Sequence, residues 1–136
     1  MGEIASNSFQ GLHVLVAEDN FILSELVRQV LVDLHCSVIG PIDDLTGTLA
    51  AIRSSKHIDG ALLDVQLGEE NILPAAQELA LRGVPFILTT GHANLVGLPA
   101  LLANAPLLTK PFDLQGLQDM MKSTFGRGLE NGSEAV

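Results

Sequence analysis

The sequence predicts an α/β fold in which one doubly wound, five-stranded parallel sheet carries helices on both faces. Five short apolar runs alternate along the chain with longer segments of helical periodicity. The runs are apolar throughout, without alternating polar residues, which is typical of parallel strands buried on both faces. A chain of 136 residues has the length of a single domain.

Each predicted strand is a short apolar or β-branched run bounded by polar, glycine or proline residues. The second strand is expected to end where Pro41 interrupts it. The five predicted strands are residues 12–17, 37–40, 58–64, 84–90 and 105–109.

The first two predicted helices begin after residues that favour N-terminal caps. Asp19 or Asn20 precedes residues 21–34, where apolar side chains recur at helical spacing. Asp43 or Asp44 precedes the second helix. The apolar positions that define this second helix are Leu45, Leu49 and Ile52.

The third and last helices carry stop signals as well. Residues 71–82 form the third helix, with Gly83 as its C-cap. The last helix begins after Asp113 and is expected to end at Gly126. Between them, glycine and proline interrupt residues 92–104, which predicts a short or irregular helix there. The buried stripe of the last helix is predicted to be Leu114, Leu117, Met121 and Phe125.

The composition limits the possible functions. A formal net charge of -9, from 16 acidic and 7 basic residues, argues against a surface that binds nucleic acid. No apolar stretch is long enough to span a membrane, and the N-terminus lacks the pattern of a signal peptide. The single cysteine, Cys36, is expected to be a buried, reduced thiol. We therefore expect a cytoplasmic protein whose domain, residues 11–126, lies between flexible ends, residues 1–10 and 127–136.

Polar side chains follow four of the five predicted strands. Glu18 and Asp19 follow the first strand, and Asp64 ends the third. Thr90 ends the fourth, and Lys110 follows the fifth. Right-handed crossovers bring the carboxyl ends of all parallel strands to one edge, where α/β sheets bind their ligands. We therefore expect these five side chains to lie close together.

Each of these residues has a simpler explanation when it is taken alone, as a helix cap, a turn residue or a surface lysine. Three carboxylates at one edge would repel one another, and a divalent cation relieves that repulsion. Carboxylate oxygens and water are the ligands that suit Mg²⁺. Lys110 would then face Asp64, or a phosphoryl group attached to Asp64.

Four motifs, in this order and spacing, resemble the receiver domain of bacterial two-component response regulators. They are LVAEDN (15–20), ALLDVQLG (61–68), FILTTGHA (86–93) and LLTKPF (107–112). The resemblance extends over about residues 12–125 and implies the flavodoxin-like strand order 2-1-3-4-5. It also implies a stand-alone signalling switch, not an enzyme, that accepts a phosphoryl group from the phosphohistidine of a histidine kinase.

The resemblance assigns a role to each residue of the predicted site. Asp64 is the implied phosphoacceptor, Thr90 the switch hydroxyl and Lys110 the lysine that contacts the phosphoryl group. Asp19 binds Mg²⁺ directly, whereas Glu18 acts through metal-bound water. The implied metal ligands are Glu18, Asp19, Asp64 and the backbone carbonyl of Gln66.

Three further features concern residues near this site. The Lys110–Pro111 bond is expected to be cis. Leu107 occupies a position where the family often has Tyr or Phe, so an aromatic relay from Thr90 is not expected. Gly68 occupies the position of the usual proline. Signal output is therefore expected to use the irregular segment after the fourth strand.

The implied partners are a sensor histidine kinase or a phosphotransfer protein, and a downstream protein that the sequence does not identify. We expect a monomer or weak homodimer that docks to this protein without an attached output domain and binds neither nucleic acid nor membrane. Two alternatives remain open. One is a pseudo-receiver that binds partners without phosphorylation, and the other is a small phosphatase or phosphotransferase with an aspartyl-phosphate. Gln66 disfavours the second, because such hydrolases commonly carry an acid there.

Overall fold

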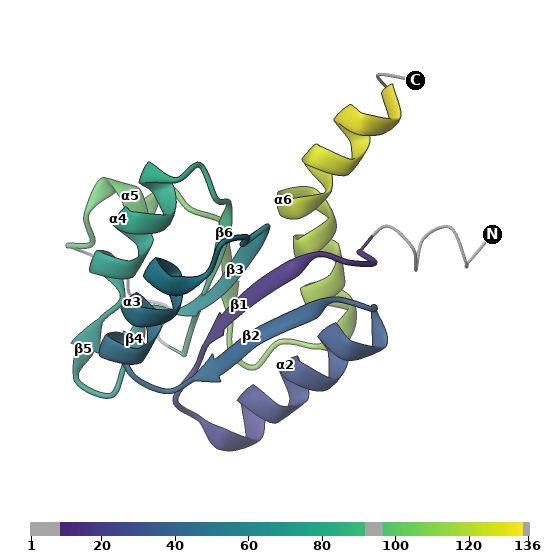
Figure 1. Ribbon diagram of the computed structural model, residues 1–136. Helices are drawn as coiled ribbons and strands as arrows, with labels where there is room; N and C mark the ends of the chain where they lie inside the picture. Colours follow the sequence, from purple (N-terminus) through teal and green to yellow (C-terminus); the bar gives the residue numbers. More distant parts are fainter. Residues whose placement is uncertain (1–8, 92–96, 135–136) are drawn as a thin grey trace.

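The computed structural model describes residues 9–91 and 97–134, and its side chains are described through residue 126. A five-stranded parallel sheet has the order β2-β1-β3-β6-β7, which is the predicted order 2-1-3-4-5 (Figure 1). Its strands are β1 (His13–Ala17), β2 (Ser37–Ile42), β3 (Gly60–Asp64), β6 (Phe86–Thr90) and β7 (Leu107–Thr109). The helices are α2 (Phe21–Asp33), α3 (Leu45–Ser54), α4 (Leu73–Leu81), α5 (Ala100–Ala103) and α6 (Leu114–Glu134). Within the described ranges, no helix combines the length and the apolar character needed to cross a membrane.

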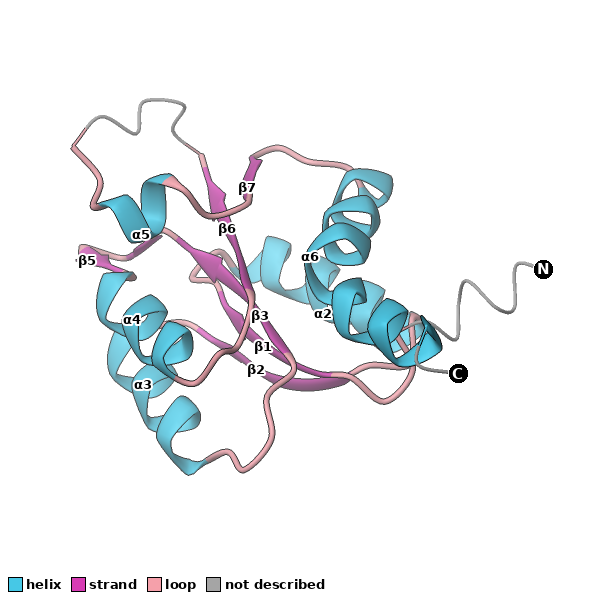
Figure 2. Cartoon of the chain, turned by 90° about the horizontal axis from the view of Figure 1, so that it is seen from above, coloured by secondary structure: helices cyan, strands magenta, loops and turns pink. Residues whose placement is uncertain are grey.

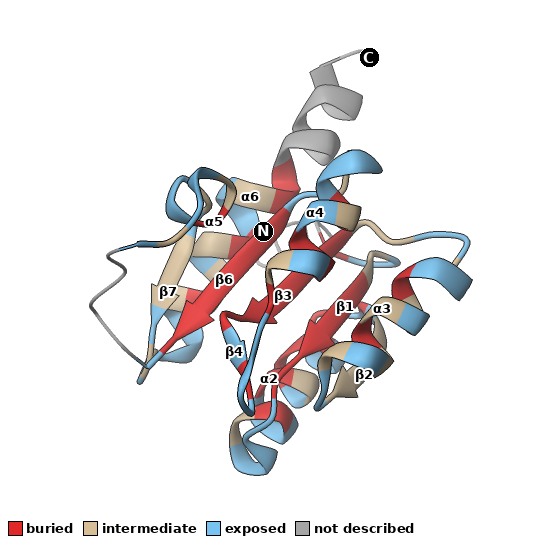
Figure 3. Cartoon of the chain, turned by 90° about the vertical axis from the view of Figure 1, so that its left-hand side faces the viewer, coloured by how far each residue is buried: buried red, intermediate tan, exposed pale blue. Residues whose placement is uncertain are grey.

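Helices cover both faces of the sheet, as the sequence predicted. α2 and α6 lie on one face, and α3, α4 and α5 lie on the other (Figure 2). Val14 and Val16 of β1 belong to the apolar cluster beneath α2 and α6, whereas Leu15 and Ala17 belong to the opposite cluster. The three central strands are buried on both faces, while β2 and β7 at the edges are more exposed (Figure 3). Burial on both faces explains why the central runs are apolar throughout.

β2 continues beyond the proline that was expected to end it. The strand runs through Pro41 to Ile42, and its register against β1 shifts between Leu15 and Ala17. β2 is an edge strand, so a residue without an N–H can face its open side without breaking the ladder. The predicted stop at Pro41 is therefore wrong. The Gly40–Pro41 and Lys110–Pro111 bonds are both cis, and the second confirms a prediction.

α6 continues past Gly126 to Glu134, so the predicted end at Gly126 is wrong. Gly126 lacks the positive φ with which a glycine terminates a helix. A helical glycine costs only about 1 kcal/mol relative to alanine, which is too little to end a helix by itself. Leu114, predicted in the buried stripe, is 45% exposed, whereas the other three predicted members are buried.

Phe9 extends the core toward the N-terminus. It is buried and packs in the cluster beneath α2 and α6, so the core begins before the predicted boundary at residue 11. The thiol of Cys36 lies 3.5 Å from the backbone carbonyl of Phe9 and donates to it. Cys36 is therefore a buried thiol, as predicted.

The capping residues match the sequence pattern. Asn20 accepts a hydrogen bond from the N–H of Leu23, and Asp44 accepts one from the N–H of Gly47. α4 ends just before Gly83, whose φ of 72° suits a glycine beyond a helix end. α5 has four residues, which agrees with the short helix expected after the fourth strand. Residues 92–96 of that segment lie outside the described residues.

A small antiparallel hairpin follows β3 and was not predicted. Its strands are β4 (Gln66–Leu67) and β5 (Glu70–Asn71), and α4 begins at Leu73, later than the predicted residue 71. Gly68 begins the two-residue loop of the hairpin and has a φ of 60°. Glycine is favoured there because other L-residues rarely adopt positive φ. The hairpin places Gly68 beside the carboxyl edge of the sheet.

Candidate functional site

The five side chains predicted to meet do lie at the carboxyl edge of the sheet. Glu18 and Asp19 follow β1, Asp64 is the last residue of β3, Thr90 ends β6 and Lys110 follows β7. Carboxylate oxygens of the three acids lie within 4.8 Å of one another. The parallel sheet produces this convergence, because its strands all end at the same edge.

The ammonium group of Lys110 lies between two of the acids. Its Nζ is 2.8 Å from Oε1 of Glu18 and 2.8 Å from Oδ2 of Asp64. The exposed fractions of these carboxylate side chains are only 4% and 8%, so water screens the pairs weakly. Burial disfavours the charge on Lys110, but the hydrogen bonds to Asp64 and Glu18 outweigh it and raise the pKa of Lys110. The lysine is therefore charged at neutral pH.

Glu18 lies in an environment that raises its pKa. Burial is the main cause that raises the pKa of Glu18, and the nearby charge of Asp64 raises it further. Hydrogen bonds from Lys110 and from the N–H of Asn20, 2.9 Å from Oε2, act in the opposite direction. The carboxylate therefore depends on its donors to remain ionised.

Asp19 is held at the site by the backbone of the unpredicted hairpin. The N–H of Gly68 donates to Oδ2 of Asp19 at 2.8 Å. A proline at position 68 would have no N–H to donate, and its φ is fixed near -65° instead of the 60° observed. The departure from the family pattern noted in the sequence thus supplies a contact to the predicted metal ligand. The sequence shows the unusual glycine at position 68 but does not predict this contact, because the contact joins residues far apart in the chain.

Asp64 and Thr90 are both buried at the ends of neighbouring strands. The N–H of Gln66 donates to Oδ1 of Asp64 at 3.1 Å, which leaves the two oxygens of Asp64 with different partners. The backbone carbonyl of Thr90 accepts a hydrogen bond from the N–H of Lys110 at 2.7 Å. β6 and the residue after β7 are therefore linked directly at the site.

The donor set fits a hard divalent cation. The cluster offers carboxylate oxygens of Glu18, Asp19 and Asp64, with no nitrogen or sulfur ligand among them. Oxygen ligands are those that Mg²⁺ prefers, and it usually retains several waters. Asp19 is exposed, so the site is open to solvent on its side. The residues present are compatible with Mg²⁺.

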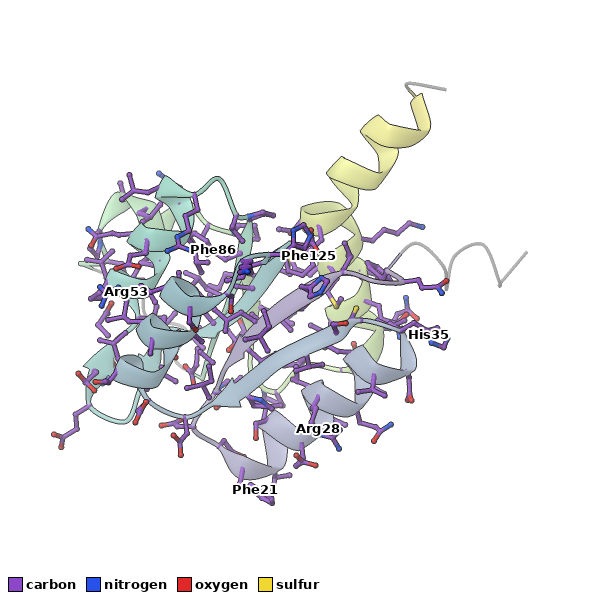
Figure 4. All side chains as sticks on the ribbon, viewed as in Figure 1. Phe21, Arg28, His35, Arg53, Phe86 and Phe125 are labelled. Atoms are coloured by element: carbon purple, nitrogen blue, oxygen red, sulfur yellow. The ribbon has the colours of Figure 1, made fainter. Side chains whose placement is uncertain are left out.

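Two large apolar residues are exposed beside the acidic edge. Phe21 is 77% exposed and Ile22 is 80% exposed, and both lie in the first turn of α2, shortly after Asp19. Figure 4 shows Phe21 projecting outward from the beginning of α2. Exposed apolar side chains that lie together next to a site are typical of protein–protein contacts.

Several solved structures share this fold at a similar size. The chain is 30% identical to SdrG from Sphingomonas melonis Fr1, with a TM-score of 0.71 over 82% of this chain and 93% of that chain. A response regulator receiver protein from Sinorhizobium medicae WSM419 is 22% identical, with a TM-score of 0.71 over 83% of this chain and 93% of that one. A CheY-like receiver domain protein from Methanospirillum hungatei JF-1 is 21% identical, with a TM-score of 0.75 over 93% and 100%. Neither a family model nor a curated protein matches the sequence.

Proposed function

Because this chain belongs to the receiver domains of response regulators, we propose that it is a phosphorylation-dependent switch whose phosphoacceptor is Asp64. Receiver domains are signalling proteins and not classical enzymes. The proposed donor is the phosphohistidine of a histidine kinase or of a phosphotransfer protein. The proposed output is contact with another protein.

The bridging position of Lys110 is the observation that carries this proposal. A lysine with a purely solubilising role would extend into water, whereas Nζ of Lys110 lies 2.8 Å from two buried carboxylates. A phosphoryl group on Asp64 would therefore meet a cation already held at hydrogen-bonding distance from that carboxylate. Such a charge-assisted contact is strong and needs little reorganisation.

The transfer is a substitution at phosphorus. An oxygen of the Asp64 carboxylate attacks the phosphorus of the phosphohistidine, and the P–N bond breaks as the O–P bond forms. The electron pair of the broken bond leaves with the imidazole. Lys110 stabilises the negative charge on the phosphoryl oxygens, and the N–H of Gln66 orients the attacking carboxylate. Bound Mg²⁺, held by Glu18, Asp19, Asp64 and the backbone carbonyl of Gln66, would add positive charge beside the same oxygens.

Thr90 is the proposed switch residue. The residue is buried at the end of the strand beside β3, so a phosphoryl group on Asp64 would offer its hydroxyl an ionised acceptor. The proposed route of the signal runs from Thr90 to Lys110, whose N–H binds the carbonyl of Thr90, and then to the segment between β6 and β7. Leu107, half-buried in β7, replaces the aromatic residue that would otherwise accompany this change.

Phe21 and Ile22 are the proposed docking residues for the phosphodonor. A partner that delivers a phosphoryl group must approach the carboxyl edge closely, and these two exposed side chains lie next to it. Their burial against a partner would be favourable, since removing apolar surface from water contributes about 25 cal/mol per Å².

Intact-mass analysis with a small phosphodonor tests the proposed chemistry. The wild-type chain should gain one phosphoryl group in the presence of Mg²⁺ and lose this labelling when Mg²⁺ is chelated. Asp64→Asn should abolish labelling, because a carboxamide is a poor nucleophile. Asp19→Asn should remain folded but lose the Mg²⁺-dependent rate. Asp113→Asn, at the exposed cap of α6, is the matched control and should be labelled normally.

Two outcomes would contradict the proposal. Labelling of Asp64→Asn at the wild-type rate would mean that another residue is the nucleophile. A wild-type chain that is never labelled, although it binds Mg²⁺, would favour the pseudo-receiver alternative.

A further inference from the structure

A second group of metal-binding side chains lies at the opposite edge of the sheet. His13 begins β1, and His57 and Asp59 lie in the loop that leads into β3. β1 and β3 are neighbouring parallel strands, and their register places His13 beside Asp59. The length of β3 separates Asp59 from Asp64 by about 16 Å, at roughly 3.3 Å per residue. This His–Asp cluster is therefore separate from the candidate phosphorylation site.

Asp59 lies between the two imidazoles. Its Oδ1 is 2.9 Å from Nε2 of His57, and its Oδ2 is 3.5 Å from Nδ1 of His13. The two rings are in edge-on contact, with centroids 5.0 Å apart and an interplanar angle of 85°. The backbone fixes the carboxylate, because the N–H of His13 donates to Oδ2 at 2.8 Å and the N–H of Asp59 donates to the carbonyl of His13 at 2.8 Å. The arrangement of donors is thus set by the sheet.

One polar atom of the His–Asp cluster, Nδ1 of His13, is not accounted for by hydrogen bonding. This nitrogen is shielded from solvent, and its 3.5 Å contact with Oδ2 of Asp59 is not a hydrogen bond, so among the described residues it has no hydrogen-bond partner. Buried polar atoms nearly always have a partner, so an exception calls for an explanation. A cation bound at this nitrogen would supply one, since a neutral imidazole nitrogen is a good metal ligand.

We propose that His13, His57 and Asp59 bind Zn²⁺. One ligand atom from each residue lies within 4.8 Å of the others. Ligand atoms about 2.0–2.2 Å from a tetrahedral zinc ion are about 3.3–3.6 Å apart, so small shifts complete the site, including a widening of the 2.9 Å separation between Nε2 of His57 and Oδ1 of Asp59. The side chain of His57 is 66% exposed in a loop and can rotate to provide them.

The ligand types distinguish this site from the acidic edge. Two imidazoles and one carboxylate suit zinc and other late transition metals, whereas Mg²⁺ requires oxygen ligands. The partly exposed side chains of His13 and His57 leave a path for the ion and for a water ligand in the fourth position. Excess Mg²⁺ should therefore occupy the acidic site and leave the His–Asp cluster available.

Competition titration of Zn²⁺ against a chromogenic chelator, in excess Mg²⁺, tests the site on the whole chain. The wild type should bind one equivalent of Zn²⁺. His57→Ala and His13→Ala should each weaken binding by about tenfold or more, since even partners that only orient a ligand contribute about 10–100-fold. His35→Asn is the matched control and should bind normally. His35 is exposed with a φ of 65°, which asparagine tolerates.

Thermal unfolding separates ligand loss from misfolding. Without Zn²⁺, His57→Ala should unfold at the wild-type temperature, because His57 is a loop residue with an exposed side chain. Added Zn²⁺ should raise the unfolding temperature of the wild type and of His35→Asn, but not that of His57→Ala. Equal affinity in the wild type and in His57→Ala would overturn the proposal. Loss of all Zn²⁺ binding in excess Mg²⁺ would also overturn it, because the ion would then occupy the acidic edge.

Discussion

Replacing Lys110 with methionine should destabilise the fold in a way that depends on pH. The substitution keeps most of the length of the side chain but removes the charge that lies between Glu18 and Asp64. Both carboxylates are almost completely buried, so water cannot replace the lost ammonium group. The variant should therefore take up a proton at this pair instead of holding two unpaired charges.

Protonation sets the size of the expected effect. Glu18 has an ordinary pKa of 4.5, which is about 2.5 units below pH 7. Keeping this side chain protonated at pH 7 therefore costs about 3.4 kcal/mol. The resulting carboxyl group can donate to the Asp64 carboxylate, so one proton is sufficient. We expect the free energy of unfolding to fall by about 3 kcal/mol at pH 7, at the lower end of the range for a broken buried ion pair.

The sign of the pH dependence follows from the raised pKa of Glu18. Burial already raises this pKa in the wild type, and loss of Lys110 removes an influence that lowers it. The folded variant then binds a proton more tightly than the unfolded chain. The contribution of Glu18 to the stability of the variant should be fully present below pH 4.5 and should be lost as the pH rises through the folded-state pKa. The deficit relative to wild type should therefore shrink by up to about 1.4 kcal/mol for each pH unit below 7.

Urea unfolding at several pH values, with and without Mg²⁺, measures this effect. Lys122→Met, an exposed lysine of α6, is the control and should change the stability by about 0.5 kcal/mol or less. Saturating Mg²⁺ should restore part of the stability of Lys110→Met, since the ion compensates the same carboxylates. If the two lysine variants unfold at the same urea concentration at pH 7, the reasoning is refuted. A deficit that grows as the pH falls would refute it as well.

Three further predictions concern single positions. Gly68→Pro removes the N–H that binds Asp19. It should raise the Mg²⁺ concentration needed for half-maximal labelling by about tenfold or more, as expected for the loss of a hydrogen bond to a charged group. Gly68→Ala keeps the N–H, and an equal effect in both variants would argue against this contact. Burial, aided by the charge of Asp59, raises the pKa of the Cys36 thiol from 9.0 to about 11. The thiol should therefore react slowly at neutral pH unless urea unfolds the chain. The stability should also fall between pH 9 and pH 11, by at most about 3 kcal/mol, and Cys36→Ala should lose this dependence. Gly60→Ala would place a methyl group 2.6 Å from the ring of Phe125. The substitution should lower the free energy of unfolding, measured by urea titration, by about 1–3 kcal/mol. An unchanged urea midpoint would show that the ring moves aside easily.

The cluster at the carboxyl edge of the sheet could be predicted from the sequence because its residues are placed by local patterns and one topological rule. Glu18, Asp64 and Lys110 each follow an apolar run, and parallel strands with right-handed crossovers must end at the same edge. The cap at Asn20 is equally local, since its hydrogen bond spans three residues. No knowledge of distant packing was needed to place these groups together.

Other features depend on contacts between residues far apart in the chain, and only the tertiary structure decided them. The N–H of Gly68 binds Asp19, 49 residues away, through a hairpin too short to leave a periodic signal. Phe9 belongs to the core because α2 and α6 cover it, although its neighbours in the sequence are polar. His13 meets Asp59 only because β1 and β3 pair in a particular register.

The two residues that were predicted to end a strand and a helix also show that local sequence preferences can be overruled. Pro41 and Gly126 disfavour a strand and a helix by local preferences of a few kcal/mol at most. β2 tolerates its proline because it lies at an edge of the sheet, and α6 continues through a glycine whose predecessor, Phe125, is packed against Gly60. A local preference determines where an element ends only when tertiary packing does not outweigh it, and sequence alone does not reveal that packing.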